Sequence, residues 1–78
     1  MVAEELKDHL WRVLRTASRP KFPNELLDTV CRQSRQEYSV EDAQTLLDKW
    51  VDSGFVRAQS RGVYLISPTG RELSAAPE

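Results

Sequence analysis

The stretch from Gly54 to Gly70, GFVRAQSRGVYLISPTG, constrains the fold of this chain more than any other. Gly54 is predicted to end a helix, because a left-handed residue just past a helix end needs no Cβ. Residues 55–59 and 63–67 are rich in aromatic and β-branched side chains, which predicts two short strands. Gly62 lies between them and permits a tight turn. The stretch therefore predicts a helix followed by a β-hairpin over about 55–67.

The hairpin is predicted to lead into a last, short helical element. Ser67 and Pro68 are the residue types favoured at an N-cap and at the first helical position. We expect this helical turn to reach Leu73, and residues 74–78 to form a frayed tail.

Three amphipathic helices are predicted upstream, over about 3–17, 24–34 and 40–53. Apolar residues recur at helical spacing in each of them. Pro20 and Pro23 separate the first two helices, since prolines do not fit inside a helix, and Ser39 is a suitable N-cap for the third. The residues expected to face the core are Leu6, Leu10, Val13, Leu14, Ala17, Leu26, Leu27, Val30, Cys31, Ala43, Leu46, Leu47 and Trp50.

Three further residues carry predictions about packing. Phe22, in the loop between the first two helices, is expected to fill the core. Cys31 belongs to an apolar stripe and is interpreted as an inert core thiol. Trp11 lies at the edge of such a stripe, which suits either a residue folded over the core or a dimer or partner contact.

The residues from Val40 to Gly70 resemble small winged helix-turn-helix domains of the MarR, PadR and ArsR-like kind. In those domains a helix with an apolar end is followed by Gly-apolar-Val, which leads into the wing and is matched here by Gly54-Phe55-Val56. The wing ends in an aromatic-x-Leu-Thr-x-x-Gly exit, matched by Tyr64-x-Ile66-Ser67-x-x-Gly70. The resemblance implies an α+β fold, a single winged helix-turn-helix domain over 1–78. The resemblance is more specific for the fold than for the function, because one fold can carry many different functional sites.

The resemblance also implies duplex DNA as a partner, in a transcription-regulatory or related role. Such domains read bases from the solvent face of the third helix, where Gln44, Thr45 and Lys49 are the candidate contacts. Arg57 and Arg61 in the wing are candidates for gripping the DNA backbone.

An alternative is a protein-interaction module. The third helix carries four acidic residues, Glu41, Asp42, Asp48 and Asp52, against the single cation Lys49. Carboxylates are unfavourable beside phosphates, so this helix is also suited to docking a basic partner protein, with Val51 as an apolar contact.

Composition excludes several other classes. With one cysteine and one histidine in 78 residues, the chain offers no intrachain disulfide and no familiar zinc pattern. Its three glycines form no phosphate loop, and no catalytic constellation can be drawn, so we expect no enzyme, no metal and no cofactor. The formal net charge of −1 lacks the basic excess typical of nucleic-acid binders. No long apolar run is present, so we expect a cytoplasmic protein without a membrane segment.

Overall fold

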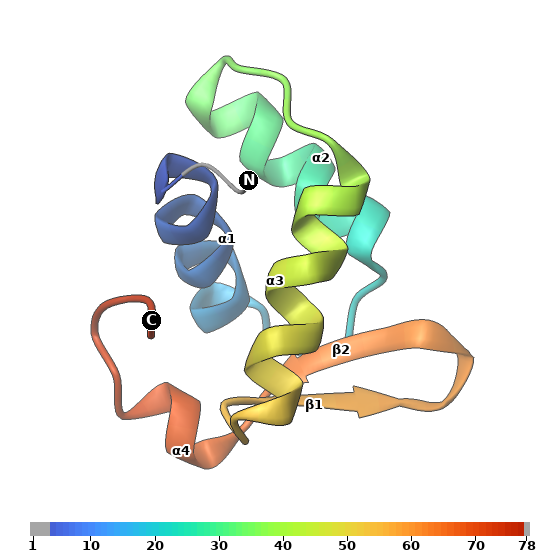
Figure 1. The fold of residues 1–78 in the computed structure, drawn as a ribbon, viewed down its shortest axis with the longest axis vertical. Coiled ribbons are helices and arrows are strands. Elements are labelled where there is room, and N and C mark those ends of the chain that lie inside the picture. The colour runs from blue at the N-terminus through green and yellow to red at the C-terminus, as the bar shows by residue number, and fades with distance from the viewer. Residues whose placement is uncertain (1–3, 78) are drawn as a thin grey trace.

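The computed structural model describes residues 4–77, which form three helices, an antiparallel hairpin and a short last helix (Figure 1). This α+β order is the one predicted. The elements are α1 (Glu4–Thr16), α2 (Pro23–Ser34), α3 (Val40–Asp52), β1 (Val56–Gln59), a single helical turn (Ser60–Gly62), β2 (Val63–Ile66) and α4 (Pro68–Arg71). Position 3, where the first helix was expected to begin, and position 78 of the predicted tail lie outside the described residues.

The helix ends form as their residue types predict. The Ser39 hydroxyl accepts a hydrogen bond from the Glu41 amide at 3.1 Å and caps α3. Gly54 has a φ of +86°, a conformation that residues with a Cβ rarely adopt. Pro23 is the first residue of α2, where its missing N–H costs nothing.

The hairpin joins α3 through a buried serine. The Ser67 hydroxyl donates to the Gly54 carbonyl at 2.8 Å and accepts from the Gly70 amide at 3.1 Å. The Phe55 amide donates to the carbonyl of Trp50 at 2.9 Å. The base of the hairpin is therefore tied both to the end of α3 and to α4.

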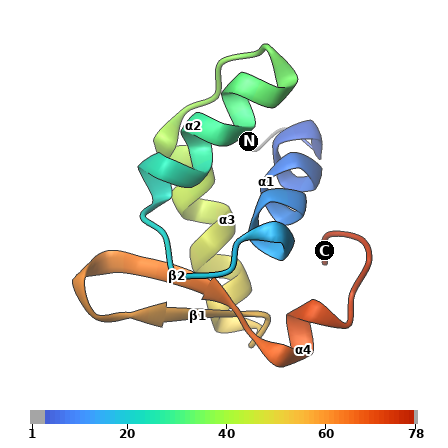
Figure 2. The ribbon, with the colours of Figure 1, turned by 180° about the vertical axis from the view of Figure 1, so that it is seen from behind.

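A third extended segment, not predicted from the sequence, lies beside β2. Lys21 forms an antiparallel bridge with Tyr64, and their amides and carbonyls exchange two hydrogen bonds of 2.8 and 2.9 Å. The segment between α1 and α2 consequently runs along the free edge of the hairpin (Figure 2). The Val56–Ile66 and Gln59–Val63 pairs set the register on the other side of β2.

Trp11 belongs to the core and not to its edge. It is 2% exposed, and its ring meets that of Trp50 edge-on at 5.0 Å. Of the two alternatives for Trp11, its burial agrees with a residue folded over the core, and its ring has little surface left for a dimer or partner contact. The other core residues are Leu6, Leu10, Val13, Leu14, Leu26, Val30, Ala43, Leu46, Leu47, Trp50, Val56, Tyr64 and Ile66.

Phe22 does not fill the core, contrary to the prediction. Its side chain is 44% exposed. Side chains alternate between the two faces of an extended chain, so Lys21, paired with Tyr64, leaves its neighbour Phe22 on the opposite face. Cys31 also differs from the prediction, because it is half-buried beside Leu27 and Tyr38 at a surface hollow.

The segment after α4, up to Pro77, lies against the helices. The indole N–H of Trp11 donates to the Leu73 carbonyl, and that of Trp50 donates to the Pro77 carbonyl, both at 3.4 Å. Ala76 packs against the core. The tail therefore accepts a hydrogen bond from the indole N–H, the one polar group in the side chain of each buried tryptophan.

Candidate nucleic-acid interface

Three residues of α3 were predicted to contact DNA, and two of them are exposed on the outer side of the helix. Thr45 and Lys49 are both exposed, one turn apart. The Thr45 hydroxyl donates to the Glu41 carbonyl at 2.9 Å within the helix. These two side chains are accessible to a partner on this side of the domain.

Gln44, the third, is half-buried and engaged within the protein. Its amide nitrogen donates to the Tyr64 hydroxyl at 2.6 Å and to the Asp48 carboxylate at 2.9 Å. The Tyr64 hydroxyl also donates to Asp48 at 3.4 Å. One amide bond links α3 to β2 and the other stays within α3, so reading a base through this amide group would require breaking these bonds.

Lys49 shares the exposed surface of α3 with three carboxylates. Glu41, Asp48 and Asp52 are all exposed, and we call these three residues the acidic face. Asp42 and Val51 are half-buried, and Val51 packs against the core. Val51 is thus only partly available as the apolar partner contact proposed for this helix.

The sheet carries the opposite charge. Arg57 and Arg61 are exposed in the hairpin, Arg61 at its turn with a φ of +71°. The Lys21–Tyr64 bridge brings the 17–24 segment beside the hairpin. The segments 17–24 and 53–71 together contain five cations and no Asp or Glu: Arg19, Lys21, Arg57, Arg61 and Arg71.

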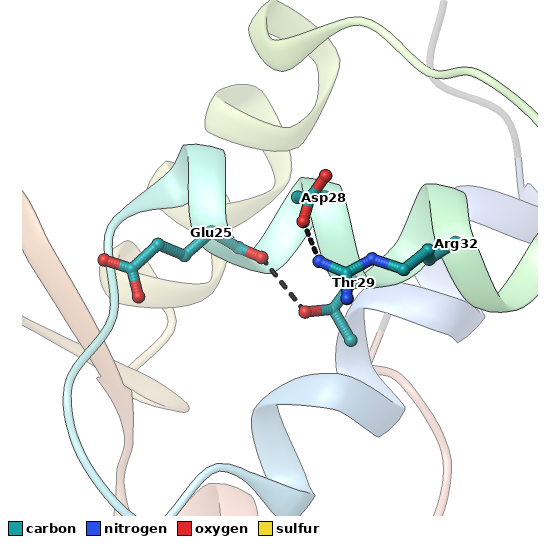
Figure 3. A network of polar contacts seen from close by, with 4 residues as sticks. All are labelled: Glu25, Asp28, Thr29 and Arg32. Atoms are coloured by element: carbon teal, nitrogen blue, oxygen red, sulfur yellow. Dashed lines mark hydrogen bonds and ion pairs between the residues drawn. The ribbon is translucent and has the colours of Figure 1, made fainter.

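Charges on α2 are balanced locally. Arg32 forms an ion pair with Asp28 one turn earlier on the exposed side of the helix (Figure 3). The neighbouring Thr29 hydroxyl donates to the Glu25 carbonyl at 3.1 Å. α2 thus offers a paired arginine, whereas the segments 17–24 and 53–71 hold five cations and no acid within their bounds.

Two surface hollows lie away from this interface. One, of about 560 Å³, lies between α1 and the tail, and the other, of about 390 Å³, lies beside α2. Over residues 4–77 no group of His, Cys, Asp or Glu side chains is arranged to hold a metal ion. Within the same range no helix has the length and apolar character needed to cross a membrane.

A comparison of the chain with protein-family models, curated proteins and solved structures found no match. The role of this surface is therefore inferred from the positions and charges of its residues. The sequence identified Arg57 and Arg61, but nothing in it indicated that the 17–24 segment would join them. That association depends on one backbone bridge between residues far apart in the chain.

Proposed function

We propose that the protein is a DNA-binding domain of the winged-helix kind, which contacts duplex DNA mainly through its hairpin and acts in transcription regulation or a related process in the cytoplasm. The observation that carries this proposal is the concentration of cations, without any acid, in the hairpin and the segment beside it. Such a patch attracts a phosphate backbone even when the net charge of the whole domain is close to zero.

In the proposed complex the hairpin makes the main contacts with DNA, and α3 makes fewer contacts at the edge of the interface. Arg57 and Arg61 bind phosphates, with the option of Arg61 entering the minor groove from the turn. Lys49 and Thr45 approach the edge of the major groove. The acidic face opposes deep insertion of α3, since its three carboxylates would lie near phosphates. We therefore expect weak, strongly salt-dependent binding with little sequence preference.

The test is a salt titration of duplex affinity with single arginine variants. Each phosphate contact contributes about 0.9 to the slope of log affinity against log salt concentration. Arg57→Ala and Arg61→Ala should each weaken binding at low salt and reduce the slope by about that amount. Arg32→Ala is the matched control, because Arg32 is also exposed but is paired with Asp28 on α2. If Arg57→Ala and Arg61→Ala changed the affinity and the salt slope no more than Arg32→Ala does, the proposed contact of the hairpin with DNA would be contradicted.

A second candidate function rests on the acidic face. Glu41, Asp48 and Asp52 present three exposed carboxylates along one helix, a surface suited to a basic partner protein. The two functions respond oppositely to Glu41→Lys combined with Asp52→Lys. The double variant should bind duplex DNA more tightly if α3 lies near phosphates, and should lose a basic partner if the acidic face is the docking site.

A further inference from the structure

The outer side of the sheet has an unusual composition for a surface open to solvent. Across the hairpin Arg57 pairs with Leu65, and Gln59 pairs with Val63. Paired residues point to the same side of a sheet. The Lys21–Tyr64 bridge adds a third row, in which alternation places Pro20 and Phe22 on that same side. We call these six residues the sheet face: Pro20, Phe22, Arg57, Gln59, Val63 and Leu65.

The sheet face is not part of the core. Val56, Tyr64 and Ile66 are buried on the opposite side of the sheet. Among residues 4–77 the partly buried apolar side chains that pack against the core are Leu27, Tyr38, Val51, Phe55, Leu73 and Ala76. Val63 and Leu65 are half-buried but do not belong to that group, and Phe22 is 44% exposed. Phe22 and the half-buried Val63 and Leu65 therefore share this side of the sheet, and we call these three residues the apolar strip.

The charge around this strip selects an anionic partner. Arg57 lies on the sheet face itself, Arg61 lies at the hairpin turn, and Arg19 immediately precedes the strip. No carboxylate occurs in the segments that form it. A basic protein is thus disfavoured here, and so is a second copy of the same face, which would place arginine against arginine.

The combination of an exposed aromatic ring, two half-buried aliphatic side chains and an arginine matches the chemistry of unpaired bases. Bases in a duplex are stacked on one another and present only their edges, whereas bases of a single strand can stack on an aromatic side chain while cations hold the phosphates. We infer that the sheet face binds single-stranded DNA, with one base stacked on Phe22 and the backbone held by Arg57. The inference rests on the proposed function for the nature of the polymer and shares Arg57 with it, whereas the stacking of a base on Phe22 belongs to this inference alone.

Fluorescence anisotropy with a labelled thymidylate strand of about 12 nucleotides tests this inference. Phe22→Ala should weaken binding by at least about fivefold, the loss expected for one stacked base. Val40→Ala is the matched control, because Val40 is similarly exposed at 41% but lies at the start of α3. Its affinity for the single strand should be unchanged. Duplex affinity should be unchanged in both variants.

Phe22→Trp provides an independent readout. It should retain the affinity of the parent protein, and the new indole should be quenched when the strand binds. Trp11 and Trp50 are 2% and 1% exposed, so they contribute little to that change. An unaltered affinity in Phe22→Ala, or an unquenched indole in Phe22→Trp, would overturn the inference.

The outcomes separate this inference from the proposed function. Duplex binding without single-strand binding overturns the inference and leaves the proposed function intact. Single-strand binding that depends on Phe22, in the absence of duplex binding, supports the inference and rejects the duplex proposal. If Phe22→Ala converts a dimer into monomers and leaves strand affinity unchanged, the sheet face is a self-association surface and the inference fails.

Discussion

The acidic face of α3 and the sheet face lie on the same small domain, yet they differ in charge and in the use of their polar groups. The helix presents three exposed carboxylates and commits the Gln44 amide to Tyr64 and Asp48. The sheet presents Arg57, Arg61 and the apolar strip, of which Phe22 is the exposed member. A net charge of −1 averages these two surfaces and conceals both. The comparison shows that the electrostatic character of a domain this small has to be assessed face by face.

The largest effect is expected at Gly70, which packs against the base of the hairpin. A Cβ on Gly70 would clash with the Phe55 carbonyl oxygen at the base of the hairpin and would approach Ile66 Cγ1 to 2.9 Å. Gly70→Ala should lower the free energy of unfolding by about 3 kcal/mol, the upper range for overpacking. Thermal or denaturant unfolding measures the change.

Gly62→Ala is the matched control for that substitution. A Cβ at Gly62 meets nothing within 4 Å, but the φ of +76° is unfavourable for alanine. The cost should be about 1 kcal/mol. Equal destabilisation by the two variants would show that the packing around Gly70 is not what holds the hairpin against α3.

The next largest effect is expected from loss of the hydrogen bonds between Tyr64 in β2 and the residues Gln44 and Asp48 in α3. Tyr64→Phe removes the hydroxyl that accepts from Gln44 and donates to Asp48. We expect a loss of about 1 kcal/mol of unfolding free energy, typical of one hydrogen bond. Amide exchange should increase in β2 more than in α2. Unchanged exchange in β2 would mean that this network does not position the hairpin.

The smallest effect is expected in duplex affinity, when one negative charge is removed from the acidic face. Asp52→Asn removes one exposed charge from the acidic face without reversing it. A charge about 10 Å from a phosphate in water costs roughly 0.4 kcal/mol, so duplex affinity at low salt should rise about twofold. Anisotropy titrations of the two proteins measure the difference. A lower affinity in the variant would place this carboxylate in a favourable contact and contradict the hairpin-led geometry.

The sequence predicted the elements well because each depends on short-range signals. Helical spacing, the Ser39 cap and Pro23 indicated α2 and α3 to within about one residue at each end, and Gly62 indicated the turn. Such features involve residues only a few positions apart, so no knowledge of the tertiary structure was needed.

The errors concern residues whose environment depends on distant parts of the chain. Phe22 was expected in the core because it is apolar, but the Lys21–Tyr64 bridge turns it outward. For Trp11 the sequence left open a place over the core or a dimer or partner contact, because its burial also depends on the tail, where the Leu73 carbonyl accepts from its indole N–H. The engagement of Gln44 required a tyrosine twenty positions later in the chain. Candidate contacts in the hairpin could be named from the sequence, while their neighbours in space could not.

The most direct test of the central claim is an amide-shift titration of the labelled protein with duplex DNA at low salt, repeated at about 200 mM salt. If the cations of the hairpin lead the interaction, shifts should concentrate on residues 19–22 and 57–63, remain small over 41–52, and largely disappear at the higher salt concentration. Shifts concentrated on 41–52, or no shifts at low salt, would contradict hairpin-led DNA binding.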